Sequence, residues 1–359
     1  MSVQIVLMFI GGLALLVLGG DWLVRGSARL AVAIGITPLV VGLTVVAFGT
    51  SAPELAVSVQ ASIGGQADLA IGNILGSNIS NILLILGLSA VFAPLVVSQQ
   101  LIRLDVPLMI VVSIVAFGLS LDGRVSTWDG WFLVAALVAY TVFAIVNSRK
   151  ETKKIHEQYE KEFGEKPEAA ERAHLGKDLF LIVIGIGGLV LGSKWLVTSA
   201  VAVARFFGVS ELVIGLTIVA IGTSLPELAT SVVAAMKGQR DIAVGNVVGS
   251  NLFNILSVLG LTAVVVPLGI PVPSAALTFD FPVMIAVSIA CLPIFFIASG
   301  IQSRISSRPS FSTSGIRDDP IPRSGRTIRR TSWGSAETNV MLFAPRSRPN
   351  TRPLRRAAR

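Results

Sequence analysis

The sequence has few of the residues on which disulfides, zinc sites and most catalytic centres depend. Its 359 residues include one cysteine and two histidines, and only 14% of them are charged. The single Cys291 excludes an intrachain disulfide, and we expect it to be apolar filler in a helix. The two histidines, His156 and His174, lie in a polar segment without the ligand spacing of a zinc site. The sequence also lacks a phosphate-binding glycine loop and a nucleophile–base pair, so it predicts that the protein is not an enzyme.

The scarcity of charge accompanies long apolar stretches. About a quarter of the residues of a soluble domain are charged, whereas this chain is 53% hydrophobic. A helix needs roughly 20 apolar residues to cross a bilayer. We therefore predict an all-α polytopic membrane protein with nine transmembrane helices, over residues 3–20, 37–63, 71–96, 104–120, 128–147, 178–197, 209–235, 243–268 and 279–299. The first stretch lacks a basic segment before it and a small-residue cleavage site, so we interpret it as a helix and not as a signal peptide.

The chain repeats itself at an offset of 173 residues. GTSAPELAVS at 49–58 returns as GTSLPELATS at 222–231, and GNILGSNISNILLILG at 72–87 returns as GNVVGSNLFNILSVLG at 245–260. About 33 of the 54 positions from 35 to 88 are identical in the second copy. Because the first unit has an odd number of spans, the second enters the membrane the other way up. The sequence therefore predicts an inverted-topology repeat, the architecture of many secondary transporters.

Composition divides the chain into four parts. We expect a first transmembrane repeat at 1–147, a charged cytoplasmic linker at 148–177, a second repeat at 178–300 and a tail at 301–359. The second repeat has four spans where the first has five, so its last helix is apparently lacking. The tail holds 13 arginines and three acidic residues, and its Arg/Ser/Pro-rich composition predicts disorder. It either contacts anionic lipid or nucleic acid, or it is an unselected extension in place of a tenth helix. We adopt the second interpretation and expect the bilayer, but no nucleic acid, as a partner.

Basic residues in the loops predict the orientation of the chain. With the N-terminus outside, the cytoplasmic loops hold Arg25, Arg29, Arg103, Arg149, Lys150, Lys153, Lys154, Lys237 and Arg240. The opposite loops hold little beyond Arg124 and Arg205. By the positive-inside rule we expect a multi-pass protein of a cell inner membrane, with the linker and the tail in the cytoplasm.

Each repeat places one glutamate in an apolar stretch. A carboxylate near the middle of a bilayer costs on the order of 2.5–3.5 kcal/mol on insertion scales. Glu54 and Glu227 have no basic neighbour in the sequence that would offset this cost. A protonated or snorkelling glutamate would explain one such residue, but two in matched motifs indicate bound cations.

Hydroxyl groups accompany both glutamates. Thr50 and Ser51 precede Glu54 by four and three residues, so on a helix all three share a face. The second repeat has the same arrangement in Thr223, Ser224 and Glu227. Hydroxyl and carboxylate oxygens are ligands for Na⁺ or Ca²⁺, whereas a transition metal would favour histidine or cysteine.

Prolines suggest a second type of ligand. Because proline has no N–H, Pro53 and Pro226 each deprive a carbonyl four residues earlier of its helical partner. We expect freed carbonyls near 47–49 and 220–222 to point at an ion. Irregular backbone at this depth occurs where it lines a site or a cavity; a simple kink is the alternative.

The following helix of each repeat has a polar stripe with four-residue spacing. The stripe consists of Asn73, Ser77 and Asn81 in the first repeat and of Asn246, Ser250 and Asn254 in the second. Such side chains either contact an ion or join helices by hydrogen bonds. We expect the serines together with Asn81 and Asn254 to contact the ion, and leave Asn73, Asn78 and their counterparts open.

Four further aspartates lie near predicted helix starts. We expect Asp68 and Asp241 to be N-caps, and Asp105 and Asp280 to be caps or interfacial residues.

The paired motifs GTSAPELAVS with GNILGSN and GTSLPELATS with GNVVGSN closely resemble the two alpha-repeats of the calcium/cation antiporter superfamily. The nearest resemblance is to its prokaryotic sodium/calcium exchanger branch, and it covers roughly residues 1–300. It implies ten helices, ion sites clustered between the repeats, and Na⁺ entry that drives Ca²⁺ extrusion. It also implies the ion ligands Ala47, Thr50, Ser51, Glu54, Ser77, Asn81, Ala220, Thr223, Ser224, Glu227, Ser250 and Asn254. The two alanines would act through their backbone carbonyls.

Two departures from the family pattern matter. Some relatives have an acidic residue where this chain has Asn254, and that acid is associated with potassium co-transport, so Asn254 argues against potassium dependence. The apparent lack of the tenth helix puts folding, insertion or activity in question.

The sequence thus predicts a secondary-active antiporter that exchanges Na⁺ for Ca²⁺ by alternating access. Both ions would compete for one central site, and no cofactor is expected. The first and sixth helices have no polar centre, and we hypothesise that they slide against the others. The alternatives are a Ca²⁺/H⁺ antiporter that uses the same glutamates, a passive cation channel, and an inactive truncated homologue.

Overall fold

A computed structural model describes the backbone of residues 3–93, 97–163, 175–208 and 220–306. The chain divides into a compact unit, Met1–Arg308, and a second unit, Pro309–Arg359. The predicted tail after residue 306 and the middle of the predicted linker, residues 164–174, lie outside the described residues. Within the described part the protein is helical, apart from two short strands.

The first repeat begins with one long helix and continues with several helices that are interrupted by π-helical segments. Its elements are α1 (Val3–Ile34), α2 (Pro38–Val41), η1 (Gly42–Val46), α3 (Ala47–Thr50), α4 (Ala52–Ile63), α5 (Ala67–Ser80), η2 (Asn81–Leu86), α6 (Gly87–Phe92), η3 (Leu101–Asp105), α7 (Val106–Leu119), β1 (Arg124–Val125) and α8 (Thr127–Phe163).

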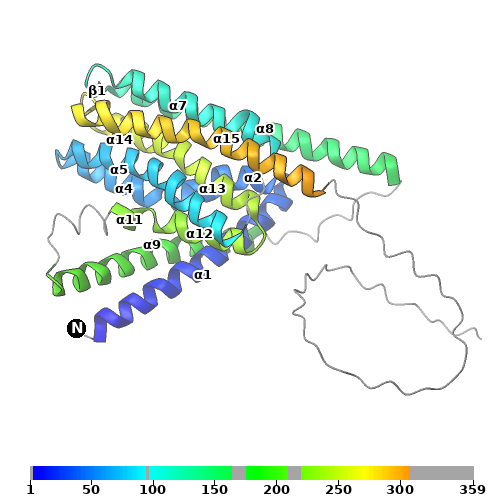
Figure 1. The fold of residues 1–359 in the computed structure, drawn as a ribbon, viewed down its shortest axis with the longest axis horizontal. Helices are drawn as coiled ribbons and strands as arrows, with labels where there is room; N and C mark the ends of the chain where they lie inside the picture. Colours follow the sequence, from blue (N-terminus) through cyan, green and yellow to red (C-terminus); the bar gives the residue numbers. More distant parts are fainter. Residues whose placement is uncertain (1–2, 94–96, 164–174, 209–219, 307–359) are drawn as a thin grey trace, which may run out of the picture. The chain divides into compact units, whose positions relative to one another are not determined.

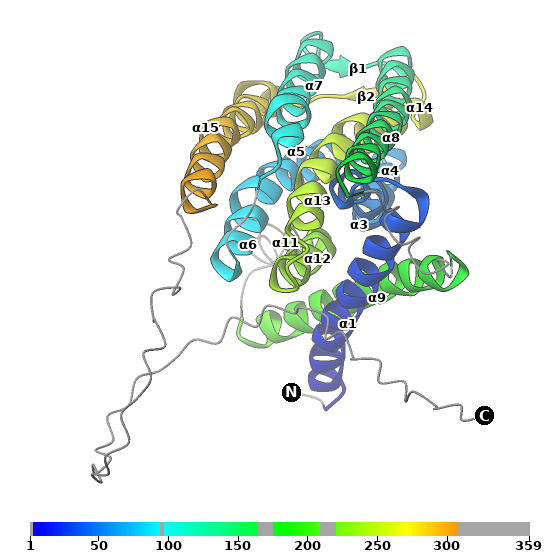
Figure 2. The same ribbon diagram turned by 90° about the vertical axis from the view of Figure 1, so that its right-hand side faces the viewer.

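The helices and π-helical segments of the second repeat follow the same order as those of the first where they are described. The second repeat consists of α9 (Leu175–Phe206), α11 (Ala220–Thr223), α12 (Leu225–Met236), α13 (Arg240–Phe253), η5 (Asn254–Leu259), α14 (Gly260–Val265), β2 (Ile270–Pro271), η6 (Ala276–Asp280) and α15 (Phe281–Ser306). Its strand β2 comes before η6 and α15, whereas β1 of the first repeat comes after η3 and α7. Strands β1 and β2 pair antiparallel and connect the loop after α7 with the loop before α15. In Figures 1 and 2, α1 and α9 lie on one side of the remaining helices, while α7 and α8 lie on the opposite side.

The spans agree with the predicted membrane protein. Seven of the described helices are long and apolar enough to cross a bilayer, and the bent pair Pro38–Thr50 and Ala52–Ile63 makes an eighth span. The remaining predicted span, 209–235, begins outside the described residues and continues as α11 and α12.

Helix α1 is longer than the sequence suggested. Arg25 and Arg29 were expected in a loop after the first span, but they lie in the last turns of this 32-residue helix. At 1.5 Å per residue, such a helix is about 48 Å long and extends well past a hydrocarbon core of about 30 Å. Its basic end carries an ion pair within the helix, between Arg25 Nε and Asp21 Oδ2 at 2.9 Å, so the two charges support the helix beyond the apolar stretch.

Glycines allow α1 and α9 to pack with their backbones in contact. A Cβ atom on Gly12 would lie 2.9 Å from the carbonyl oxygen of Gly192, and one on Gly19 would lie 2.8 Å from that of Gly185. The order of these contacts runs in opposite directions along the two helices, so α1 and α9 are antiparallel, as an inverted repeat requires. Gly12 and Gly185, like Gly19 and Gly192, keep the 173-residue offset.

Two neighbouring glycines of α9 test this packing. A Cβ on Gly185 would lie 2.6 Å from the backbone nitrogen of Leu23, whereas one on Gly187 would meet nothing within 4 Å. We expect Gly185→Ala to lower the free energy of unfolding by about 1–3 kcal/mol, because backbone atoms cannot yield cheaply. Gly187→Ala should stay within about 1 kcal/mol of the wild type. Thermal unfolding in detergent measures both, and equal melting temperatures for the two variants would contradict the packing.

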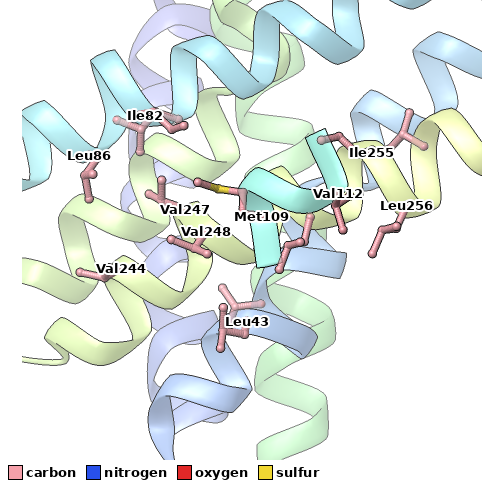
Figure 3. Packing of buried hydrophobic residues seen from close by; sticks show 14 of the residues in the cluster. Leu43, Ile82, Leu86, Met109, Val112, Val244, Val247, Val248, Ile255 and Leu256 are labelled. Atoms are coloured by element: carbon pink, nitrogen blue, oxygen red, sulfur yellow. The ribbon is translucent and has the colours of Figure 1, made fainter. Parts of the chain in front are cut away.

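Helix α13 forms the centre of the fold together with η5 and α14. In the most apolar stretch of this span, 89% of the residues are buried. Helix α13 packs against α2, η1 and α3 of the first repeat and against α12 of its own repeat. Figure 3 shows Leu43 of η1 near Val244, Val247 and Val248 of α13, with Met109 of α7 on the other side.

The counterpart of this span, α5 with η2 and α6, is less covered. Leu256 is 2% exposed, but its repeat counterpart Leu83 is 61% exposed. Helix α8 makes the difference, because its Gly130 backs onto Gly260, whereas a Cβ on the counterpart Gly87 would meet nothing within 4 Å among the described residues.

Candidate cation site

Both glutamates follow a break in a helix. The helical path is interrupted at Ser51 (φ −83°, ψ 3°) and at its counterpart Ser224 (φ −88°, ψ 6°). At the first break the flanking helices are bent by 43°. Thr50, Ser51 and Glu54 are therefore not on the face of one continuous helix, as the spacing suggested. Glu54 and Glu227 instead lie in the first turns of α4 and α12, where the helix dipole favours negative charge.

The carbonyls around each break are arranged differently from the expectation. The carbonyl of Ala47 accepts the N–H of Ser51 at 2.9 Å and the hydroxyl of Thr50 at 3.3 Å. The carbonyl four residues before Pro226 belongs to Gly222, and Ser193 of α9 donates its hydroxyl to it at 2.6 Å. Ala220 begins α11, and its side chain lies outside the described features. That Ala47 and Ala220 offer carbonyls to an ion stays a prediction.

The two carboxylates are fully buried and short of hydrogen-bond donors. Glu54 is 0% exposed and Glu227 1%. Oε1 of Glu227 accepts the hydroxyl of Ser51 across the repeat boundary at 3.1 Å. Both carboxylate oxygens of Glu54 and Oε2 of Glu227 have no partner. Neither residue has an ion pair within the described part of the chain.

Hydrogen bonds between the repeats follow the pseudo-two-fold relation. Thr50 donates to Asn246 Oδ1 at 3.1 Å, and its counterpart Thr223 donates to Asn73 Oδ1 at 3.4 Å. The amide nitrogen of Asn73 donates to Ser58 at 2.9 Å and to the Glu54 carbonyl at 3.2 Å. The counterpart Asn246 makes the equivalent bonds, to Ser231 at 2.9 Å and to the Glu227 carbonyl at 3.3 Å. Asn73 and Asn246 therefore join helices with both ends of their amides, which was one of the two interpretations left open.

In the side-chain amides of Asn81 and Asn254, which begin η2 and η5, the nitrogen forms a hydrogen bond and the oxygen does not. Asn81 Nδ2 donates to Asn251 Oδ1 at 3.0 Å, and Asn254 Nδ2 donates to Asn78 Oδ1 at 3.1 Å. Oδ1 of Asn81 and Oδ1 of Asn254 are buried without a partner. Asn81 and Asn254 are also the first residues of their π-helical segments, and such segments are frequent at functional sites.

The remaining predicted hydroxyls are also buried. Ser77 is 5% exposed and Ser250 is 0% exposed. The hydroxyl oxygen of Ser250 lies 3.4 Å from that of Thr50. The hydroxyl of Ser224 has no partner.

The unsatisfied atoms of this cluster are all oxygens. They are Oε1 and Oε2 of Glu54, Oε2 of Glu227, Oδ1 of Asn81, Oδ1 of Asn254 and Oγ of Ser224. A buried polar atom without a partner costs about 1–3 kcal/mol, so binding of a cation or of water at these oxygens would be favourable. Carboxylate, amide and hydroxyl oxygens fit a hard cation such as Ca²⁺. Within the searched residues there is no group of three or more His, Cys, Asp or Glu side chains that would suit a transition metal.

Two of the four further aspartates do not have the capping role that was predicted for them. Asp68 and Asp241 lie in the first turns of α5 and α13, but the N-caps are Gln66 and Gln239 and no side-chain cap bond forms. Capping failed as a prediction because the helices begin two residues earlier than the motif suggested.

Asp105 occupies the N-cap position of α7 and is 0% exposed. It precedes α7 without a capping bond and accepts hydrogen bonds from Tyr140 at 3.2 Å and Gln100 at 3.3 Å. Its counterpart Asp280 ends η6 and is half-buried.

Two methionines near the amide cluster were not anticipated. Asn78 Nδ2 donates to the sulfur of Met284 at 3.4 Å, and Asn251 Nδ2 donates to that of Met109 at 3.5 Å. A signal was present, because Met109 and Met284 have the same 175-residue offset as Asp105 and Asp280.

Comparisons with known proteins identify the family to which the chain is similar. The family described as "Sodium/calcium exchanger protein" matches residues 4–146 and 177–315. The inner membrane protein YrbG of Escherichia coli (strain K12) is 42% identical over 288 residues, which cover 79% of this chain and 86% of that protein. The sodium/calcium exchanger MaX1 of Methanosarcina acetivorans is 34% identical over 318 residues, covering 80% of this chain and 90% of the other. The structure of the sodium-calcium exchanger NCX_Mj, soaked with 2.5 mM Na⁺ and 0.1 mM Ca²⁺, superposes with a TM-score of 0.68 at 30% identity, over 86% of this chain and all of that one.

Proposed function

Because the chain belongs to the sodium/calcium exchanger protein family, as its motifs predicted, we propose that it exchanges Na⁺ for Ca²⁺ across the membrane. Family membership supports cation/calcium antiport in a multi-pass membrane protein. The observation that carries the finer proposal is the cluster of unsatisfied, buried oxygens around Glu54 and Glu227.

The charge of the cluster gives a basis for the exchange. Two carboxylates carry two negative charges, which balance one Ca²⁺ or two Na⁺. Ionised and unpaired, they would repel each other in a medium of low dielectric constant, so the empty site is unfavourable. Either cation relieves this repulsion, and the two cations therefore compete for the same oxygens. No further cofactor is required.

Alternating access would involve α1 and α9. The site oxygens that lack partners come from α4, α12, η2, η5 and the break at Ser224, and none comes from α1 or α9. These two helices pack against each other along their glycines, backbone to backbone, whereas Gly49 of α3 and Gly222 of α11 face side chains of α9. We propose that they move as one unit past the site and expose it to each side in turn.

Contacts among the basic segments support the proposed orientation. Lys237 forms an ion pair with Asp21 of α1, and Arg29 lies 3.7 Å from Asp178 at the start of α9. Ser148 of α8 accepts the N–H of Thr37 at 2.8 Å. The end of α1, the end of α12 and the beginning of the linker therefore lie at one face of the protein. We propose that this face is cytoplasmic and that the N-terminus is outside, because basic residues favour the cytoplasm.

Calcium flux into vesicles tests the proposed function. Purified protein in proteoliposomes loaded with Na⁺ and diluted into Na⁺-free buffer should take up radioactive Ca²⁺, because outward Na⁺ movement drives inward Ca²⁺ movement. Uptake should not require K⁺, since position 254 is an asparagine.

Three other results would redirect the proposal. Uptake driven by a pH gradient but not by Na⁺ would identify a Ca²⁺/H⁺ antiporter. Single-channel currents in a planar bilayer would identify a passive pore. Folded protein that transports no Ca²⁺ under either gradient would indicate that the uncovered face around Leu83 has cost the protein its activity.

A further inference from the structure

Two buried methionines contact the two pairs of asparagine side chains in the candidate site, Asn251 with Asn81 and Asn78 with Asn254. Met109 of α7 and Met284 of α15 are 0% and 1% exposed. Figure 3 shows the Met109 side chain extending from α7 toward Ile82 and Val247. Its sulfur accepts the amide of Asn251, and the sulfur of Met284 accepts the amide of Asn78. Neither methionine contributes an unsatisfied oxygen to the cluster, so neither is an ion ligand itself.

A thioether fixes which way a neighbouring amide points. Sulfur in methionine is an acceptor with no proton to donate, whereas an asparagine amide has a donor end and an acceptor end of nearly the same shape. The NH₂ group of Asn251 must therefore face Met109, and its Oδ1 must point away. That oxygen lies 3.0 Å from Asn81 Nδ2, so Asn81 presents its NH₂ to Asn251 and has its own oxygen left for the ion.

The second repeat contains the equivalent series of hydrogen bonds. Met284 receives the NH₂ of Asn78, and Asn78 Oδ1 receives the NH₂ of Asn254 at 3.1 Å. The remaining atom is again an oxygen, Oδ1 of Asn254, buried and without a partner. Each series of hydrogen bonds crosses the boundary between the repeats, because the methionine of one repeat accepts a hydrogen bond from an amide of the other.

We propose that Met109 and Met284 are positioning residues that turn the oxygens of Asn81 and Asn254, and not their NH₂ groups, toward the bound cation. The proposal rests on the proposed function, because it assumes that a cation occupies the oxygen cluster. An NH₂ group in either position would place a partial positive charge against the ion and would remove a ligand. The sulfurs thereby contribute to cation selectivity from outside the ligand shell.

Leucine variants remove the acceptor and keep the size of the side chain. We expect Met109→Leu and Met284→Leu each to weaken Ca²⁺ binding roughly fivefold, the effect of losing one intramolecular hydrogen bond. Radioactive Ca²⁺ binding to the full-length protein in detergent gives the dissociation constant. Met236→Leu is the matched control, because Met236 is 65% exposed at the end of α12 and should bind as the wild type does.

Double variants separate positioning from packing. If Met109 acts through Asn81, then Met109→Leu should have no further effect on Ca²⁺ affinity in an Asn81→Ala background. In an Asn254→Ala background it should keep its full fivefold effect. Met284→Leu should show the opposite pattern, silent with Asn254→Ala and fully effective with Asn81→Ala. A packing defect would weaken binding alike in both backgrounds, and that result would overturn the proposal.

The outcomes also distinguish this proposal from the proposed function. Na⁺-driven Ca²⁺ uptake by the wild type, together with wild-type Ca²⁺ affinity in both leucine variants, would overturn the positioning role and leave the exchange intact. A wild-type protein that binds no Ca²⁺ would overturn the exchange itself. Should Asn81→Ala bind too weakly to titrate, wild-type Ca²⁺ affinity in Met109→Leu would still overturn the proposal.

Discussion

Glu54→Gln and Glu227→Gln are each expected to abolish Na⁺-driven Ca²⁺ uptake. Either change removes one of the two negative charges in a site that is fully buried. Loss of one partner from a buried set of charges costs about 3–5 kcal/mol, which corresponds to more than 100-fold in affinity. Glutamine has nearly the same shape as glutamate, so the loss reports charge and not packing. Initial rates in proteoliposomes measure the effect, and thermal unfolding shows whether the variants are folded.

A third glutamate provides the control for this experiment. Glu151 lies in α8 on the solvent-exposed continuation of that helix, and Glu151→Gln should transport as the wild type does. Uptake within threefold of wild type in Glu54→Gln and Glu227→Gln would show that the carboxylates do not hold the transported ion. The cluster of unsatisfied oxygens would then need another ligand.

A disulfide between α1 and α12 is expected to stop transport reversibly. A Cβ atom on Gly20 would lie 3.5 Å from Cγ2 of Val233, at ordinary contact distance, so cysteines at these two positions are neighbours that can be tested for cross-linking. In a Gly20→Cys, Val233→Cys protein with Cys291→Ala, oxidation should reduce uptake to background, because α1 can no longer move past α12. A reducing agent should restore it.

The same protein before oxidation and the two single-cysteine proteins under oxidant are the controls. All three should transport, because none contains the cross-link. Full uptake by protein that mass spectrometry shows to be cross-linked would rule out movement of α1 relative to α12, and α9 with it, since the glycine contacts join α9 to α1.

The repeat made much of the fold and the site predictable. Glu54 and Glu227 could be found because two charged residues in matched apolar segments are improbable unless they have a common role. The all-α membrane fold and the family were confirmed by the helices and the comparisons. The roles of the individual ligands, among them Asn81 and Asn254, stay predictions, supported by their burial and free oxygens.

Other features depend on contacts between distant parts of the chain. A proline predicts that a carbonyl loses its partner, but only the fold brings Ser193 to the Gly222 carbonyl. Asp105 has the local sequence of an interfacial residue, and Tyr140, 35 residues away, satisfies it inside the protein. The methionine–amide bonds connect residues 142 and 206 positions apart, and no local pattern identifies them.

The polar contacts of α1 and α9 with the other helices are one-sided. Asp21 pairs with Lys237, and Ser193 binds the Gly222 carbonyl; both partners belong to the second repeat. The repeat counterparts of Asp21 and Lys237 are Lys194 and Gly64, and those of Ser193 and Gly222 are Gly20 and Gly49. Among the described residues, no hydrogen bond or ion pair joins α1 or α9 to α3 or α4.

If the protein alternates between two facing states, as proposed, these one-sided contacts would make the two states unequal in free energy, although the two repeats share their motifs. Contacts that exist in only one state bias the population toward it, and each 1.4 kcal/mol of difference changes the ratio about tenfold. Under the proposed mechanism, the protein would then rest with its site facing one side of the membrane when no ion gradient is applied.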